Sequence, residues 1–426
     1  MPNYVFLIDQ NKKPLNPISP ARARKLLVQN KAAVFRRYPF TLILKKVIPE
    51  PTIRPLTIKL DPGSKTTGIA ILDNDKVIWV AELSHRGQQI KEDLESRRAL
   101  RRGRRNRKTR YRQARFNNRK RALSWLAPSL LHRVQTIKTW VKKIMRYSPV
   151  SNCVMELVRF DTQRMQNGEI KGVEYQQGEL AGYEVREYLL EKWGRKCAYC
   201  DATEIPLQIE HIIPRASSGS NRISNLTLAC APCNQAKSNQ NIRDFLADKP
   251  SLLSRILKVA KLPLKDAAAV NSTRWKLYQT LKNILPTITG TGGQTKWNRS
   301  RFNLPKKHYI DAAATGIINS LVFLTHQPLK IKANGHGTRQ MCGTNKYGFP
   351  IRHRSNIKIH KGFQTGDIVK ALVTKGKKIG TYIGRVLVRK SGNFDISIAS
   401  GRVGGISHKY CTHLHQKDGY QYSFSR

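Results

Sequence analysis

Fourteen basic side chains and no acidic one lie between residues 97 and 121, in the interior of a 426-residue chain. This segment lacks proline and predicts one long helix that ends in the apolar stretch 122–126. Because charge covers every side, the helix cannot bury a face in an apolar core, and like charges one turn apart destabilise it in isolation. A groove lined with phosphates relieves both problems. A solvated tail or localisation signal is the alternative, but the central position argues against it.

Positive charge is concentrated in three parts of the chain. The formal net charge is +51, and the segments 1–60, 97–121 and 329–426 contribute +10, +14 and +16 of it. Nucleic acid is therefore the leading partner class, ahead of an anionic membrane surface. The remainder, which carries +11, contains the candidate catalytic residues described below.

Length and composition predict two or three folded domains with real cores, since 39% of residues are hydrophobic and six are Trp. The apolar stretches at 4–8 and 312–324 are too short for a signal-peptide core or a membrane span. Seven Cys, four of them in two C-x-x-C pairs, favour metal binding over disulfides. We therefore expect a soluble protein in a reducing cytoplasm.

Three carboxylates and one histidine form the first candidate site. The alternating segment 56–61 predicts a strand that ends at Asp61, and the turn 62–68 leads to a second strand at 69–72. Glu156 lies in another apolar strand, where an unpaired carboxylate is costly and needs a cation. His308 and Asp311 open a helix-like segment and share one of its faces.

Oxygen ligands from two strands and one helix suit a pair of Mg²⁺ ions that hydrolyse a phosphodiester. In their order along the chain, these residues resemble the split RNase H-type nuclease domain of the RuvC class. By that resemblance Asp61, Glu156 and Asp311 are its acidic residues, and His308 is the accompanying histidine.

Four cysteines, Cys197, Cys200, Cys230 and Cys233, predict a tetrahedral Zn²⁺ site. The 29 residues between the pairs exceed the roughly 15–20 of a simple zinc ribbon. The loop that the metal closes is therefore long enough to contain a further structural or functional element. A zinc knuckle with a bystander histidine is the alternative. Cys153 and Cys342 are interpreted as structural, as are the four residues His408, Cys411, His413 and His415.

Within and after that loop, Glu210 and His211 end a predicted strand, and Asn225 and Asn234 follow. This series resembles the HNH ββα-metal nuclease motif. The resemblance implies that Glu210 and Asn234 bind a catalytic Mg²⁺, that His211 deprotonates the attacking water, and that Asn225 orients its imidazole. The zinc is then structural and separate from the nuclease metal.

The complete order of motifs resembles IscB, the compact, transposon-associated family of prokaryotic RNA-guided RuvC/HNH nucleases related to type II CRISPR effectors. The N-terminal segments 13–17, 20–27 and 36–41 match the family's PLMP-type domain, with Asn16 in place of Met. The resemblance implies a monomeric protein bound to an omega-type guide RNA and to duplex DNA with a short flanking motif.

The resemblance also implies which side chains of the Arg-rich bridge helix grip nucleic acid: Arg97, Arg98, Arg101, Arg102, Arg104, Arg105, Arg107, Lys108, Arg110, Arg112 and Arg115. Alternating segments at 366–373 and 380–388, joined by a basic linker, predict a small basic β-barrel. Gln340, Arg352 and Arg354 are candidates there for reading bases, although phosphate contact is the commoner role.

These interpretations predict a multi-domain α/β protein: an N-terminal basic domain (1–54), RuvC parts at 55–96, 126–190 and 246–328, the bridge helix (97–125), the HNH domain (191–245) and a C-terminal β-rich region (329–426). The expected function is RNA-guided DNA cleavage, in which the HNH site cuts the guide-paired strand and the RuvC site cuts the displaced strand. An unguided junction-resolving or homing-type nuclease is the main alternative, and a catalytically silent basic RNA-binding protein is another.

Overall fold

The computed structural model describes residues 2–106, 125–157, 186, 189–190, 192–220, 223–261, 267–337, 341–347, 349–353 and 356–424. The chain forms two compact units. The first comprises Met1–Met155, Thr280–Gly290 and Thr295–Arg426, and the second comprises Glu156–Gln279 and Thr291–Gln294. The finer predicted division into seven segments stays a prediction.

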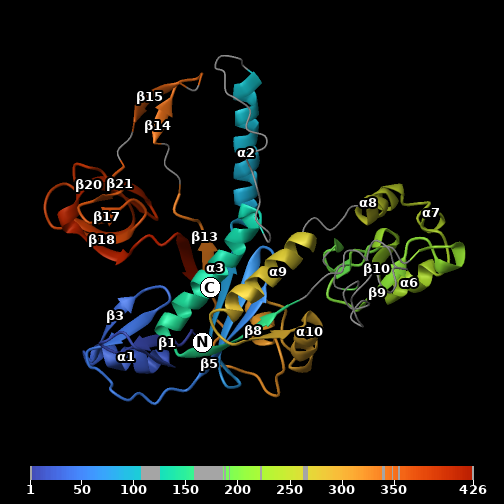
Figure 1. Cartoon of the computed structure of the whole chain (residues 1–426), viewed down its shortest axis with the longest axis horizontal. Helices are drawn as coiled ribbons and strands as arrows, with labels where there is room; N and C mark the ends of the chain where they lie inside the picture. Colours follow the sequence, from blue (N-terminus) through green and yellow to red (C-terminus); the bar gives the residue numbers. More distant parts are fainter. Residues whose placement is uncertain are drawn as a thin grey trace. The chain divides into compact units, whose positions relative to one another are not determined.

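The first unit begins with a small four-stranded sheet in the order β2-β1-β4-β3 and one helix (Figure 1). These elements are β1 (Val5–Ile8), β2 (Pro14–Ile18), α1 (Pro20–Val28), β3 (Ala32–Arg36) and β4 (Thr41–Leu44). Helix α1 starts where it does because Ser19 accepts a hydrogen bond from the Arg22 backbone and Pro20 occupies the first turn. Leu7, Leu42 and Ala23 belong to the core between helix and sheet.

A larger mixed sheet occupies the centre of the first unit, with strand order β11-β8-β5-β6-β7-β13-β23 and β12 paired to β7. Its strands are β5 (Leu56–Pro62), β6 (Thr66–Asp73), β7 (Lys76–Ser84), β8 (Val150–Glu156), β11 (Thr287–Gly290), β12 (Val322–Phe323), β13 (Leu329–Ala333) and β23 (Tyr420–Phe424). The predicted strands at 56–61 and 69–72 and the strand around Glu156 are confirmed. Strand β8 lies parallel to β5 although the basic segment separates them in the sequence.

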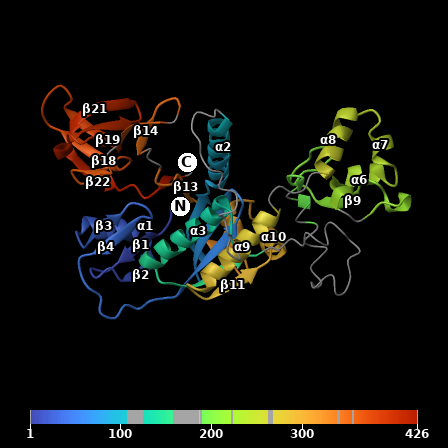
Figure 2. The same ribbon diagram turned by 45° about the horizontal axis from the view of Figure 1, so that its top comes forward.

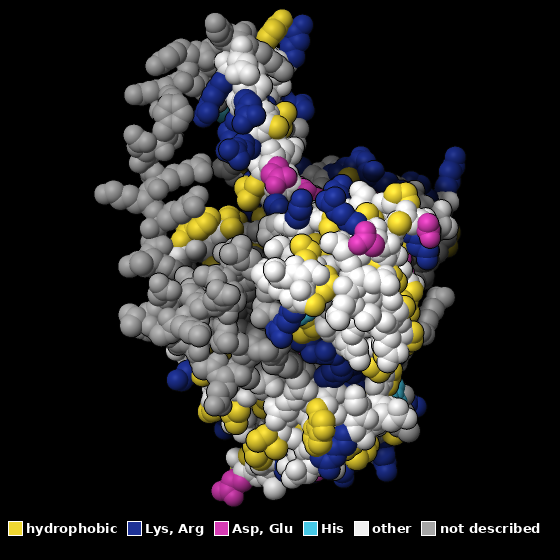
Figure 3. Space-filling view, turned by 90° about the vertical axis from the view of Figure 1, so that its right-hand side faces the viewer, with side chains coloured by type: hydrophobic (Ala, Val, Ile, Leu, Met, Phe, Trp, Pro, Cys, Tyr) yellow, Lys and Arg dark blue, Asp and Glu magenta, His cyan; other side chains and the backbone are white. Residues whose placement is uncertain are grey.

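Helix α2 (Gly87–Asn106) carries the first part of the Arg-rich run. It contains Arg97, Arg98, Arg101, Arg102, Arg104 and Arg105, all of which are exposed. The helix starts at Gly87, ten residues before the predicted start at Arg97. Figure 3 shows Lys and Arg side chains gathered on the surface of this helix. Arg107, Lys108, Arg110, Arg112 and Arg115 lie outside the described residues.

The predicted end of the Arg-rich helix, in the stretch 122–126, lies largely outside the described residues, and residues 125–127 are not helical. Pro128 then opens a new helix, α3 (Pro128–Tyr147), whose apolar face includes the fully buried Trp140 and Ile144. Helix α2 contacts α3. The Arg-rich part of α2 buries no face, as its charge predicted, whereas α3 buries its apolar face.

The C-terminal part of the first unit is rich in strands, as predicted. Strands β18 (Ile368–Val373) and β19 (Gly380–Leu387) match the two predicted strands and join β20 (Asn393–Ile398), β21 (Gly401–Ser407) and β22 (Cys411–His415). Their order, β21-β20-β19-β18-β22, leaves β21 and β22 at the edges. The described strands thus form an open sheet around Val369 and Phe394 rather than the predicted barrel. Two short pairs precede it: β14 (Cys342–Thr344) with β15 (Pro350–His353), and β16 (Ile359–His360) with β17 (Phe363–Gln364).

The second unit contains the hairpin β9 (Leu207–His211) and β10 (Leu226–Cys230), followed by α6 (Ala231–Lys237), α7 (Ile242–Phe245) and α8 (Pro250–Lys261) (Figure 2). Leu228, Ile242 and Ile256 belong to its core. Helices α9 (Ala267–Lys282) and α10 (Gly292–Arg301) each have residues in both units, and α11 (His308–Ala313) belongs to the first. No helix in the described part of the chain is long and apolar enough to span a membrane.

Candidate nuclease sites

The first candidate site forms where α11 lies on the central sheet. Asp61 is buried on β5 and pairs across the sheet with Gly68 on β6. A Cβ atom at Gly68 would lie 1.8 Å from the backbone oxygen of His308. Only glycine therefore lets α11 begin so close to the sheet. The predicted helix start at His308 is confirmed, but the helix ends at Ala313, before Gly316 with its positive φ of 85°.

One hydrogen bond and electrostatic interactions link three of the four predicted residues. The His308 Nδ1 atom lies 3.4 Å from Asp61 Oδ2. That hydrogen bond raises the pKa of His308, while burial opposes the rise. Burial and the nearby charge of Asp61 raise the pKa of Asp311 to about 6. Two carboxylates that disfavour each other's charge are suited to a shared cation.

Glu156, the fourth predicted residue, ends β8. The preceding residue, Met155, pairs with Leu60, which precedes Asp61 on β5. The boundary between the two units falls between Met155 and Glu156. The Glu156 carboxylate lies 3.8 Å from the guanidinium of Arg274, so the cation that burial was expected to demand is a side chain in this structure.

Two charged residues of this site were missed in the sequence. Arg299 on α10 lies 3.2 Å from Asp311 Oδ1. Glu82 pairs with Gly68 across the sheet, and its charge contributes to the raised pKa values of His308 and Tyr309. Glu82 had the same signal as Glu156, a lone acid in an apolar strand. Asp61 and Asp311 supply oxygen ligands of the type that divalent ions prefer, but Arg299 already pairs with one oxygen of Asp311. Among the described residues, this site does not bring three or more ligand atoms together as the cysteine group does.

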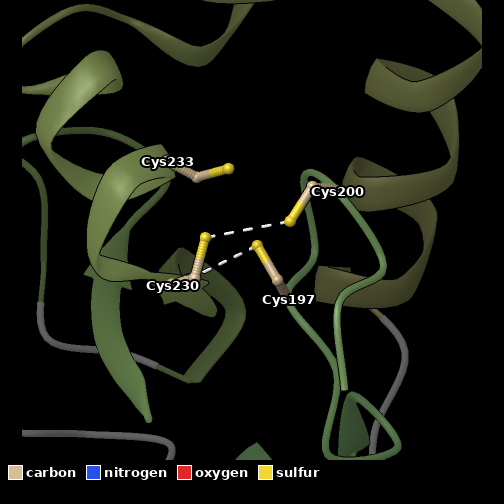
Figure 4. Close-up of side chains that lie close together, drawn as sticks. All are labelled: Cys197, Cys200, Cys230 and Cys233. Atoms are coloured by element: carbon tan, nitrogen blue, oxygen red, sulfur yellow. Dashed lines mark hydrogen bonds between the residues drawn. The ribbon is translucent and has the colours of Figure 1, made fainter. Parts of the chain in front are cut away.

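The second candidate site contains the four cysteines, whose sulfur atoms all lie within 4.8 Å of one another (Figure 4). Cys197 and Cys200 come from one loop, whereas Cys230 and Cys233 come from the junction of β10 and α6. Burial disfavours the Cys197 thiolate, but hydrogen bonds to its sulfur bring its pKa down to about 7. The arrangement fits one tetrahedral Zn²⁺. Among the described residues, no other such group of His, Cys, Asp and Glu was found.

His211 ends β9 as predicted, and Glu210 before it is 5% exposed. Both oxygens of Glu210 already have donors. The Lys237 ammonium lies 2.6 Å from Oε1, and the Tyr199 hydroxyl donates to Oε2 over 2.6 Å. Lys237 is fully buried and also donates to the backbone oxygen of His211. Burial, followed by the Glu210 charge, raises the pKa of Tyr199.

This arrangement does not fit the magnesium role predicted for Glu210, because a buried ammonium already balances its charge. Asn234 likewise donates to Gln208 Oε1 at 2.7 Å. We therefore derive no step through a metal held by these two residues. Sequence reasoning missed the partners Tyr199 and Lys237, although both lie inside the motif it used.

Asn225 is held close to the chain that follows His211. Its side chain accepts a hydrogen bond from the backbone nitrogen of Ile213 and donates to the backbone oxygens of Ile213 and Ser220. These three contacts close the loop after His211. That Asn225 also orients the His211 imidazole stays a prediction.

Comparisons with known proteins agree with this organisation. Residues 5–178 match the RRXRR protein family, and residues 197–240 match the HNH endonuclease family. A search of curated proteins found no match. The chain contains an HNH endonuclease domain, and the RRXRR match agrees with the relationship to IscB that its motifs indicated.

Solved structures with partial likeness include the Type II-C Cas9 enzyme from Actinomyces naeslundii, at 18% identity and a TM-score of 0.17, over 44% of this chain and 28% of that one. Streptococcus thermophilus Cas9 in complex with the GGAA PAM has 13% identity and a TM-score of 0.21, over 61% of this chain and 32% of that one. This chain therefore spans less than a third of the length of those enzymes. The HNH assignment rests on the family match at residues 197–240 and not on these structures.

Proposed function

We propose that this chain is an RNA-guided DNA endonuclease with two hydrolytic centres. The HNH centre at His211 cuts the strand that pairs with the guide, and the RuvC-type centre at Asp61, Glu156, His308 and Asp311 cuts the displaced strand. An omega-type guide RNA and duplex DNA with a short flanking motif are its partners. The polypeptide is monomeric within this ribonucleoprotein, which acts in the prokaryotic cytoplasm.

One observation carries the proposal. Strands β5 and β8 are neighbours in one sheet, yet the exposed Arg-rich part of α2 lies between them in the sequence and the HNH domain follows β8. A basic element is thus inserted into one hydrolytic core, and a second hydrolytic domain follows in the same chain. A nuclease that holds a nucleic acid and cuts both strands of a duplex needs this combination.

At the RuvC-type centre, the hydrogen bond between Asp61 and Nδ1 of His308 fixes the orientation of the imidazole ring. The Nε2 atom is then free to exchange a proton with the attacking water or with the leaving oxygen. When bound, a divalent cation supplies Lewis-acid stabilisation of the phosphate. Asp61 and Asp311 would hold it, with Glu156 as the further predicted ligand. At the HNH centre, His211 removes a proton from the attacking water, and Asn225 holds the adjacent loop in place.

The exposed arginines of α2 provide the counter-charge for RNA phosphates. Their contribution should fall steeply with salt, because each phosphate contact releases a counterion. The four cysteines hold a structural Zn²⁺ in this proposal, and the chemistry at His211 is separate from it. Exposure of the Arg-rich face and convergence of the thiols support these assignments.

The test begins with the RNA that co-purifies with the full chain. A defined RNA with a variable end should be present and should direct cutting of a matching end-labelled duplex. Asp61→Asn should then slow cutting of the displaced strand, and His211→Ala should slow cutting of the paired strand, each by at least about a hundredfold. His211→Ala should retain bound zinc. Two results would contradict the proposal: cutting of branched DNA without RNA, or loss of cutting of the same DNA strand in both variants.

A further inference from the structure

A cavity of about 480 Å³ lies in the first unit, and its described lining includes no residue of either candidate nuclease site. Residues Pro2 to Val5, helix α1, the turn between β3 and β4, and the ends of β13 and β23 contribute to its lining. Its volume is in the range of about 300–1,000 Å³ that small-molecule sites occupy. Neither the motifs nor the proposed catalytic mechanism uses it.

Aromatic rings form much of the lining. Trp79 is 2% exposed and stacks on Phe6 at 5.6 Å, which fixes one wall. Tyr38 stacks on Tyr422 at 4.4 Å, which fixes another. Phe40 and Phe424 also line the cavity, but they are 37% and 48% exposed, so apolar surface remains open to an occupant.

The wall itself is held by hydrogen bonds. The Asn3 side chain donates to the backbone oxygen of Val80 and accepts from the Val80 nitrogen, both at 2.9 Å. Thr325 donates to the same Asn3 side chain. Asn3 is therefore a positioning residue, and the site is largely built before an occupant enters.

Charge selects the class of occupant. Arg24 and Arg37 line the cavity and are exposed, and no acidic residue belongs to the described lining. Both lie in the segment 1–60, which has a net charge of +10. Arg37 also lies over the Tyr38 ring at 5.7 Å. An aliphatic chain or an apolar peptide has no group for these guanidinium ions, whereas a nucleotide offers a flat base to the rings and a phosphate to the arginines.

We propose that this cavity binds one unpaired nucleotide of the RNA partner, with the base against the rings of Phe40 and Phe424 and the phosphate beside Arg24 and Arg37. This inference rests on the proposed RNA-binding function and adds a site to it. Such contacts explain how the N-terminal domain holds a defined point of an RNA, because stacking tolerates any base while a single cavity fixes one position.

The full chain with its co-purifying RNA is the material for the test. Short-wave ultraviolet crosslinking followed by mass spectrometry should join one nucleotide of that RNA to a peptide containing Tyr38, Phe40 or Phe424. Phe424→Ala should reduce this crosslink at least about fivefold, since stacking on one ring contributes about 1–3 kcal/mol. Val28→Ala is the matched control, because Val28 is 86% exposed and lies outside the cavity lining.

A second pair of variants tests whether RNA binding depends on an arginine of the cavity or only on the overall positive charge of this domain. Arg24→Ala should weaken RNA retention in a salt titration and should reduce the same crosslink. Arg22→Ala, which removes an exposed arginine of α1 outside the lining, should leave the crosslink unchanged. Normal thermal unfolding of each variant excludes loss of folding as the cause.

The outcomes distinguish this site from the proposed function. If guided cutting is normal but crosslinks fall elsewhere and survive Phe424→Ala, the cavity proposal is wrong and the function stands. If no RNA co-purifies, a single-stranded RNA oligonucleotide is added as the probe, and its crosslinking to the cavity still decides this proposal. A protein segment crosslinked to the lining residues would also overturn it.

Discussion

The two candidate sites hold their carboxylates in different electrostatic surroundings. At the proposed RuvC-type site, burial and then the charge of Asp61 raise the pKa of Asp311 to about 6, and the nearby Arg299 guanidinium offsets only part of that rise. In the HNH domain, Glu210 is more deeply buried and has an ammonium and a hydroxyl on its two oxygens. The ionised form of Asp311 therefore stays disfavoured, whereas Lys237 balances the charge of Glu210.

The difference indicates which carboxylate serves the fold. When one partner of a buried ion pair is removed, the other charge stays buried without compensation, and the folded protein is strongly destabilised. A pair of mutually destabilising acids costs free energy until something cationic binds, as is common at functional sites. Replacing an acid by its amide should therefore have opposite effects on the stability of the two sites.

The largest expected effect is loss of the zinc cluster. Cys230→Ser removes one of four converging thiols and should abolish zinc binding, because three ligands remain and folding of such sites depends on metal by as much as about 10 kcal/mol. Zinc content and protease resistance of residues 197–240 measure the result. Cutting of the displaced strand should fall less than cutting of the paired strand, since Asp61, His308 and Asp311 belong to the first unit and only Glu156 of that centre belongs to the second.

Cys153→Ser provides the control for this experiment. Cys153 is a buried cysteine on β8, outside the zinc group. That variant should retain zinc. A Cys230→Ser protein with full zinc content would contradict the assignment of the cluster.

Lys237→Met should destabilise the second unit by about 3–5 kcal/mol, because it leaves Glu210 buried and charged without its partner. Chemical denaturation of the full chain, followed by a probe in that unit, measures the change. Lys258→Met on exposed α8 is the matched control and should have little effect. The double variant Lys237→Met with Glu210→Gln should recover much of the loss. Equal instability of single and double variants would mean that Lys237 acts by packing alone.

Much of this comparison could be predicted from the sequence. Alternating apolar residues predicted β5, β8 and β9, and the cysteine spacing predicted the converging thiols. These features are local, or they depend on ligand chemistry that the residue types fix. The roles of Glu210 and Asn225 depended instead on partners that only the folded chain selects. Lys237 is 27 residues from Glu210 in the sequence, and no spacing rule connects them.

The helix boundaries illustrate a second limit. The absence of proline predicted a helix through the Arg-rich run. The absence of helix-breaking residues does not, however, show at which residue a helix ends. Pro128 is a start signal for α3 that the composition of the preceding run obscured. Glu82 was missed for another reason: its importance comes from the register that puts it opposite Gly68.

Asp311→Asn should stabilise the metal-free protein by about 1–2 kcal/mol at neutral pH, since each unit of pKa shift corresponds to about 1.4 kcal/mol and partial exposure reduces the total. The pKa of Asp311 is raised from 3.8 to about 6 by folding. The folded chain thus holds this proton more tightly, and the wild type loses stability as pH rises from about 4 to about 6. Thermal unfolding over that range, with chelator present, measures the difference. If the variant and the wild type differed in stability by the same amount at every pH, Asp311 would not differ from Glu210 in the way proposed.

Tyr199→Phe should have the smallest effect, about 1–2 kcal/mol of destabilisation, because it removes one hydrogen bond to a charged acceptor and leaves the ring. The ring packs against Phe245 at 5.5 Å, and this contact survives the substitution. The ion pair with Lys237 keeps Glu210 neutralised, so the loss should be smaller than that of Lys237→Met. Denaturation midpoints of the two variants test this order. If Tyr199→Phe were the more damaging change, the hydroxyl and not the ammonium would be the main stabilising partner of Glu210.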